Sequence, residues 1–152
     1  MIVEWECILD CNFKCEYCVN GRNSALTKPI KYEKNKEKVF DFISSLKEKY
    51  PNEELFLFGG EPFLHPFIDE IIKYLNLVQM KFIIQTNASQ INNIKNIKEH
   101  FEIQVSIHPT QIKNKELFIK EIIEIENLSN LTLDASVSQH ISCTQGNIQV
   151  NG

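Results

Sequence analysis

Residues 55–62, Leu-Phe-Leu-Phe-Gly-Gly-Glu-Pro, place a short apolar run directly before a pair of glycines. Such a run is typical of a strand that is buried on both faces, as the strands of a parallel sheet are. The Gly-Gly-Glu-Pro segment (59–62) then favours a tight turn, and Pro66 suits the first position of a helix. The stretch therefore predicts one strand-turn-helix unit, with the helix over 66–77.

The same alternation continues outward in both directions along the chain. We expect further strands over 2–9, 81–86, 101–107 and 131–137, and further helices over 31–50, 91–99 and 114–127, with Ser89 as the N-cap of the helix at 91–99. Strands joined by crossover helices should be parallel neighbours with right-handed connections. Five strands and four helices in this order predict an α/β fold, either a doubly wound sheet or a curved partial (β/α) barrel.

Unusual loops follow four of the predicted strands. A cysteine-rich loop follows the first, Gly-Gly-Glu-Pro the second, Thr86 and Asn87 the third, and Ser106 and His108 close the fourth. In parallel α/β folds the loops at the carboxyl ends of the strands carry the chemistry. We therefore expect a functional site where these loops meet.

Cysteine usage points to a metal or redox site. The chain has five cysteines, and this odd number, after an acidic N-terminus unlike a secretory signal, argues against a disulfide framework. Cys11, Cys15 and Cys18 have the spacing C-x3-C-x2-C, in which soft thiolates select zinc or an iron–sulfur cluster. A structural zinc site needs four protein ligands, whereas three cysteines on a [4Fe–4S] cluster leave one iron open. Cys7 lies within the first predicted strand and is expected to be a small buried hydrophobe.

Charge and hydropathy exclude other classes of partner. The net charge is −4, and Arg22 is the only arginine among 16 basic residues, so the basic stripe of a nucleic-acid-binding protein is missing. No apolar run reaches the roughly 18 residues of a membrane span. We therefore expect no membrane and no nucleic-acid partner, and a cytoplasmic location.

On these motifs the chain resembles the radical S-adenosylmethionine (SAM) superfamily. The resemblance rests on C-x3-C-x-aromatic-C, in which Tyr17 is the aromatic residue, together with Gly-Gly-Glu-Pro after the second strand. It implies a radical SAM core domain over 1–140, folded as a truncated partial (β/α) barrel, and a tail of unknown structure over 141–152. Relatives usually have more βα units, which leaves one flank open here. A second copy of the chain or a partner protein is expected to cover it.

The resemblance also implies cofactors and site residues. Cys11, Cys15 and Cys18 would ligate a [4Fe–4S] cluster whose fourth iron binds SAM. Reduced by a protein such as flavodoxin or ferredoxin, the cluster would cleave SAM to a 5′-deoxyadenosyl radical, which would abstract hydrogen from the substrate; a peptide or small molecule is favoured. The other residues implied to contact SAM are Tyr17, Gly59, Gly60, Glu61, Pro62, Thr86, Asn87, Ser106 and His108.

Two of these positions depart from the pattern of the relatives, and two other functions stay open. Ala88 stands where relatives have the glycine of Thr-Asn-Gly, and His108 stands where many have an acidic residue. The chain could instead be a zinc-binding module without catalysis, or a cluster protein that carries electrons or is a degenerate homologue. His65 is expected to begin the following helix rather than to bind a ligand.

Overall fold

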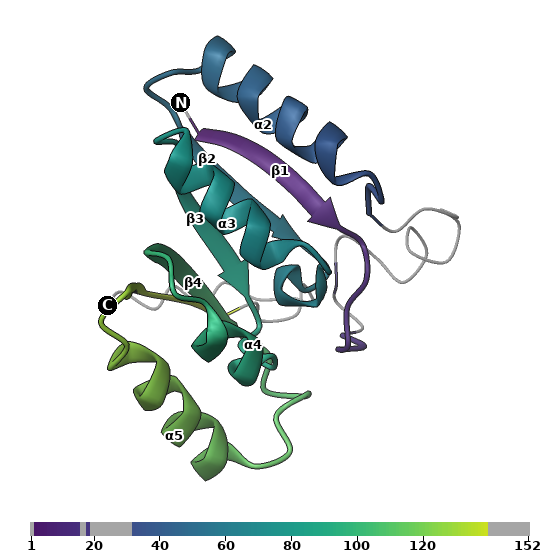
Figure 1. The fold of residues 1–152 in the computed structure, drawn as a ribbon. Coiled ribbons are helices and arrows are strands. Elements are labelled where there is room, and N and C mark those ends of the chain that lie inside the picture. The colour runs from purple at the N-terminus through teal and green to yellow at the C-terminus, as the bar shows by residue number, and fades with distance from the viewer. Residues whose placement is uncertain (1, 16–17, 19–31, 140–152) are drawn as a thin grey trace.

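The structure is a computed structural model that describes residues 2–15, 18 and 32–139. Strands and helices alternate within these ranges (Figure 1). The elements are β1 (Ile2–Ile8), α2 (Lys36–Lys49), β2 (Glu54–Gly59), the 3₁₀ helix η1 (Pro62–Leu64), α3 (Ile68–Leu77), β3 (Lys81–Thr86), α4 (Ile91–Asn96), β4 (Phe101–Ile107), α5 (Lys115–Glu126) and β5 (Leu131–Gln139). The five expected strands and four expected helices are therefore present, whereas the predicted tail at 141–152 lies outside the described residues.

The sheet is parallel throughout and its strands follow the order of the chain, β1-β2-β3-β4-β5. A doubly wound sheet would reverse this order at a switch point. With right-handed crossovers, an unreversed order puts successive helices on the same face, as in a (β/α) barrel. In Figure 1, α3 lies across β2 and β3. The partial barrel is confirmed, and the doubly wound alternative is wrong.

The core lies on the helix side of the sheet. Alternate strand residues such as Leu55, Leu57, Ile84 and Ile103 are fully buried there, and each contributes about 1.5–3 kcal/mol through the hydrophobic effect. Cys7 belongs to this core, as expected, and burial raises the pKa of its thiol to about 12. Its side chain is thus an inert apolar group rather than a ligand.

Two predicted helix starts and one predicted cap are wrong. Helix α3 begins at Ile68 instead of Pro66, because the chain first forms η1 and Phe67 occupies the N-cap position of α3. Helix α2 begins at Lys36 instead of residue 31, because Asn35 is its N-cap and accepts a hydrogen bond from the Lys38 amide at 3.2 Å. Ser89 does not cap α4: the N-cap position is Gln90, without a side-chain hydrogen bond. The Ser89 hydroxyl instead donates to Asn12 in the cysteine loop at 3.0 Å.

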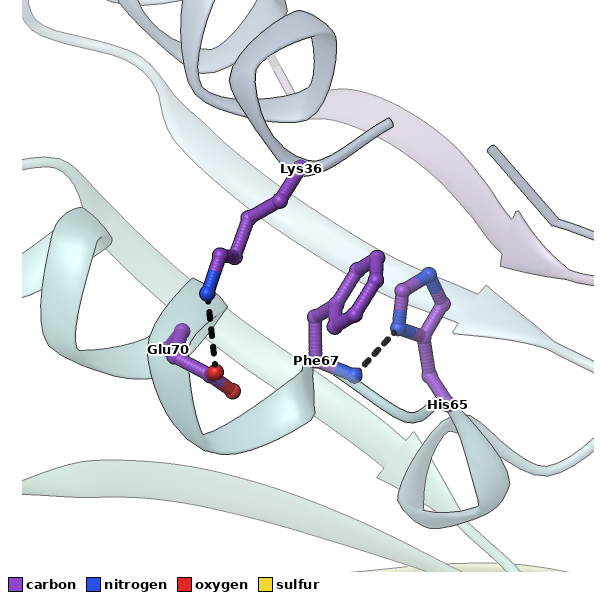
Figure 2. A network of polar contacts seen from close by, with 4 residues as sticks. All are labelled: Lys36, His65, Phe67 and Glu70. Carbon is purple, nitrogen blue, oxygen red and sulfur yellow. Dashed lines mark hydrogen bonds and ion pairs between the residues drawn. The ribbon is translucent and has the colours of Figure 1, made fainter. Parts of the chain in front are cut away.

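His65 organises the approach to α3 (Figure 2). Its Nδ1 accepts the Phe67 amide hydrogen at 3.1 Å, and burial lowers the pKa of the imidazole to about 4, so the ring stays neutral and can accept. Lys36 of α2 lies over the Phe67 ring and pairs with Glu70 of α3 at 3.3 Å, which joins the two helices. His65 is the C-cap of η1 and does not begin α3, so the expected helix-start role is wrong, although the ring does bond the amide of Phe67, the N-cap residue of α3. Among the described residues, no helix has the length and apolar character to cross a membrane.

Candidate functional site

The carboxyl ends of the parallel strands bring the unusual loops to one edge. The cysteine loop continues from β1, and the segments after β2, β3 and β4 lie beside it in strand order. Two ladder irregularities occur close to this edge, between Glu6 and Ile8 of β1 and between Gln104 and Ser106 of β4. Bulges of this kind re-aim side chains next to functional sites.

The two glycines fix the cysteine loop to the end of β2. The Gly60 amide donates to Ile8 O and the Glu61 amide to Asp10 O, both at 2.8 Å. A Cβ added to Gly59 would lie 2.1 Å from Ile8 O, and one added to Gly60 would lie 2.0 Å from Asp10 O. Gly59 also has a φ of +151°, which disfavours any side chain. The close approach that requires glycine is therefore to the protein's own backbone at the start of the cysteine loop.

The Glu61 carboxylate points into the protein. It is fully buried, and one oxygen accepts from the Phe63 amide at 3.1 Å and from the Thr86 hydroxyl at 2.7 Å. The other oxygen accepts from the Asn87 amide at 2.8 Å. Burial raises the pKa of Glu61 to about 7, although these hydrogen bonds favour the charged form. The carboxylate thus ties the turn after β2 to the end of β3.

The segment after β3 adopts a conformation suited to glycine. Ala88 has a φ of +57°, which is a left-handed conformation that costs a residue with a side chain roughly 1–2 kcal/mol. The Ala88 amide donates to the Thr86 hydroxyl at 3.0 Å, and the Ser89 amide to the Asn87 side chain at 2.9 Å. These bonds hold the strained turn and direct Asn87 towards the cysteine loop.

Side chains from the segments that follow β3 and β4 contact the cysteine loop directly. Asn87 Nδ2 lies 3.7 Å from Cys11 Sγ and 3.3 Å from the side-chain oxygen Oδ1 of Asn12. His108 Nδ1 lies 3.4 Å from Cys15 Sγ. Gln111 accepts the Lys14 amide hydrogen at 3.2 Å. The loop is therefore held by the ends of β2, β3 and β4 together.

The thiols themselves suit a positively charged group. None of the four described cysteines is in a disulfide; Cys15 is buried, whereas Cys11 and Cys18 are exposed. Desolvation raises the pKa of Cys11, and charge repulsion from Glu61, Cys15 and Cys18 raises it further, although a hydrogen bond from the Phe13 amide lowers it. Metal ligation requires thiolates, so iron in this place would relieve that repulsion. The donor set therefore fits an iron–sulfur group.

In the ranges that the structure describes, no three His, Cys, Asp or Glu side chains converge closely enough to hold a single metal ion. An iron–sulfur cluster differs from a single ion because each thiolate binds a different iron.

Most of the residues predicted from the sequence reach this edge. The structure brings together the cysteines, Gly59–Pro62, Thr86, Asn87 and His108, and Ser106 is buried near the end of β4. Tyr17 lies outside the described residues. Sequence reasoning missed Asn12, Ser89 and Gln111. Asn12 could have been noticed inside the cysteine motif, but nothing in the sequence marks Ser89 or Gln111 as contacts of the cysteine loop.

Comparison with known proteins agrees with this geometry. The family model of the radical SAM superfamily matches residues 5–135. An S-adenosylmethionine-dependent nucleotide dehydratase of Flammeovirga pacifica is 34% identical over 89 residues, which are 58% of this chain and 29% of that protein. A protein of the same name from a Thermoplasmatales archaeon (strain ISO4-H5) is 37% identical over 81 residues, 53% of this chain and 27% of that protein.

Solved structures of Streptococcus suis SuiB share the fold. SuiB bound to the precursor peptide SuiA superposes with a TM-score of 0.55 at 16% identity, covering 87% of this chain and 31% of SuiB. SuiB bound to S-adenosylmethionine gives a TM-score of 0.50 at 15% identity, covering 82% and 37%. The chain thus spans well under half the length of these relatives. Because the family model covers most of the sequence, the chain belongs to the radical SAM superfamily.

Proposed function

We propose that the chain is the catalytic core of a radical SAM enzyme, with a [4Fe–4S] cluster on Cys11, Cys15 and Cys18. The observation that carries this proposal is the shared edge: the three cysteines lie in a loop held by the Gly-Gly-Glu-Pro turn and by the ends of β3 and β4. When bound, the cluster and SAM would supply reductive cleavage to a 5′-deoxyadenosyl radical that takes hydrogen from the substrate. A flavodoxin- or ferredoxin-like protein would be the reductant.

The chain's own residues would bind and orient these groups. The Gly60 and Glu61 amides are already donated to the cysteine loop, so the turn would meet the SAM ammonium through carbonyl oxygens, which accept from a cation. Glu61 would hold Thr86 and Asn87 in place rather than touch the ammonium with its carboxylate. Ser106 and Tyr17 are proposed to complete the SAM contacts, and His108 stands beside the proposed cluster ligand Cys15. A second copy or a partner protein is proposed to cover the open flank.

The sheet face opposite the helices favours a peptide or a small molecule without a polyphosphate. Glu4 and Glu6 are exposed on that face, beside Phe56 and Phe58 of β2. Ile83 of β3 and Glu102 of β4 continue the row of Glu4 and Phe56, and Gln85 pairs with Gln104 in the next row towards the cysteine loop. These rows contain no lysine or arginine, whereas phosphate recognition relies on such cations. A nucleotide remains the second candidate, because two of the curated relatives are named as nucleotide dehydratases.

Release of 5′-deoxyadenosine tests the proposal. The protein is purified without oxygen, reconstituted with iron and sulfide, and incubated with SAM and dithionite. We expect about four irons per chain, because each cluster carries four. We also expect a paramagnetic resonance signal of the reduced cluster that changes on SAM addition, and release of 5′-deoxyadenosine. An electron carrier would show the signal without the change, and a zinc module would bind no iron.

Matched cysteine variants make the test specific. Cys15→Ala should abolish both the cluster and SAM cleavage. Cys7→Ala should keep both, since Cys7 lies in the apolar core. Full cleavage by Cys15→Ala would refute the cluster assignment. Adding basic peptides or nucleoside triphosphates to the wild type then separates the two substrate candidates by which of them increases 5′-deoxyadenosine release.

A further inference from the structure

His108 contacts a cluster ligand rather than open space. Its Nδ1 lies 3.4 Å from Cys15 Sγ, and its ring meets the Phe13 ring edge-on with centroids 5.8 Å apart. Pro109 follows His108 directly, and a residue before proline is restricted to extended backbone. The end of β4 and the Phe13 ring therefore hold the imidazole next to the sulfur. A coordinated thiolate can only accept a hydrogen bond, so Nδ1 must carry the proton in this contact.

The contact involves the one buried thiol of the motif. Cys15 is 8% exposed, whereas Cys11 and Cys18 are exposed. A hydrogen bond is electrostatically stronger where water is excluded. Asn87 approaches Cys11 in a similar way, but its Nδ2 is 3.7 Å from that sulfur and also lies 3.3 Å from Asn12 Oδ1. The stronger effect on the sulfurs is therefore expected from His108.

We propose that His108 is a positioning residue that donates its Nδ1–H to the Cys15 sulfur and so raises the reduction potential of the cluster. This inference rests on the proposed function. The external reductant adds one electron to the cluster, and the added negative charge spreads onto the sulfur ligands. A hydrogen bond to a ligand sulfur stabilises that charge and is one of the features that set cluster potentials. The proton stays on the imidazole, and no covalent bond forms or breaks in this step.

The midpoint potential of the reconstituted protein, titrated without SAM, tests the inference. His108→Phe removes the donor and keeps a ring against Phe13. It should lower the equilibrium constant for one-electron reduction about tenfold, a shift of ~59 mV to more negative potential. His108→Asn restores an N–H near the Nδ1 position and should recover most of that shift. His100→Phe is the matched control, because His100 precedes β4 at the opposite end of the sheet and its Nδ1 pairs with Asn130 O; it should leave the potential unchanged.

A second measurement needs no variant to load its cluster. Wild-type protein labelled with ¹⁵N-histidine should show a nitrogen coupling in pulsed paramagnetic resonance of the reduced cluster. A loaded wild type without that coupling overturns the inference. An unchanged potential in His108→Phe, with SAM affinity lowered instead, also overturns it and makes His108 a SAM contact.

The failure of the proposed function looks different from the failure of this inference. If the wild type assembles no cluster or does not cleave SAM, the proposed function itself is wrong. If the wild type loads and cleaves SAM while His108→Phe keeps the wild-type potential, only the role of His108 is wrong.

Discussion

Glu61 is the residue whose observed role differs most from the role that the Gly-Gly-Glu-Pro motif suggests. A carboxylate beside two glycines suggests a partner for an ammonium group, yet both of its oxygens accept hydrogen bonds from inside the protein. The sequence identifies the residue because the motif is short and contiguous. The sequence cannot give the direction of the Glu61 side chain, because its partners lie at the end of another strand. Thr86 and Asn87 are 25 and 26 residues further along the chain.

The buried Glu61 predicts a falling stability with rising pH. Its pKa is about 7 in the folded protein against an ordinary value of 4.5 for a glutamate, so the folded state binds the proton more tightly than the unfolded state. The contribution of this group is fully present below pH 4.5 and is lost as the pH rises through about 7, at up to about 1.4 kcal/mol per pH unit. Urea unfolding across this range measures it.

Glu61→Gln should remove that part of the pH dependence. The glutamine side chain must place its NH₂ group against another donor, either the Asn87 amide or the Phe63 amide and Thr86 hydroxyl. Because two donors cannot form a hydrogen bond with each other, the variant should also lose about 1–3 kcal/mol of unfolding free energy at low pH. Glu37→Gln, at an exposed position in α2, is the control for removing a carboxylate. Identical pH profiles for the wild type and Glu61→Gln would contradict the prediction.

At the scale of single elements, the sequence predicted the start of α5 closely and the start of α2 incorrectly. The predicted helix over 114–127 is nearly right, since α5 begins after the N-cap Asn114 and ends before Asn127. For α2 the predicted start at residue 31 is wrong. The lysine-rich run before Lys36 has no local signal strong enough to exclude a helix, and Asn35 is one polar residue among many. Tyr32, whose ring lies 5.1 Å from that of His65, instead packs against the core.

The N-cap of α2 predicts a measurable contribution to stability. Asn35 accepts the Lys38 amide hydrogen at 3.2 Å, and replacing such a cap by alanine typically costs about 1 kcal/mol. We therefore expect Asn35→Ala to lower the unfolding free energy by about 1 kcal/mol in chemical denaturation. Asn35→Asp should retain it, because aspartate also caps and its charge suits a helix N-terminus. Equal losses in the two variants would argue against a capping role.

At the scale of the whole molecule, the parallel pairing of the strands follows from alternating strands and helices, and the shared edge follows from parallel strands. The alternation alone could not choose between a doubly wound sheet and a partial barrel, because both have it and differ in strand order; the partial barrel was predicted only through the resemblance carried by the cysteine and Gly-Gly-Glu-Pro motifs. Likewise, spacing alone grouped the cysteines, but only the fold reveals that Asn87 and His108 reach them from other strands.

Cluster loading should therefore stabilise the whole fold. The cysteine loop is hydrogen-bonded to the turn after β2 and to residues after β3 and β4, so ligation at the loop restrains four of the five strands. Binding to the folded state alone adds to its stability by mass action, and each kcal/mol raises the Tm of a domain of this size by roughly 2–4 °C. Anaerobic calorimetry should give a Tm several degrees higher for loaded than for iron-free protein, roughly in that proportion. Cys7→Ala should lower the Tm of both the loaded and the iron-free protein and preserve the difference between them. Cys15→Ala should abolish that difference. If iron still raises the Tm of Cys15→Ala, the iron stabilises the protein from another site.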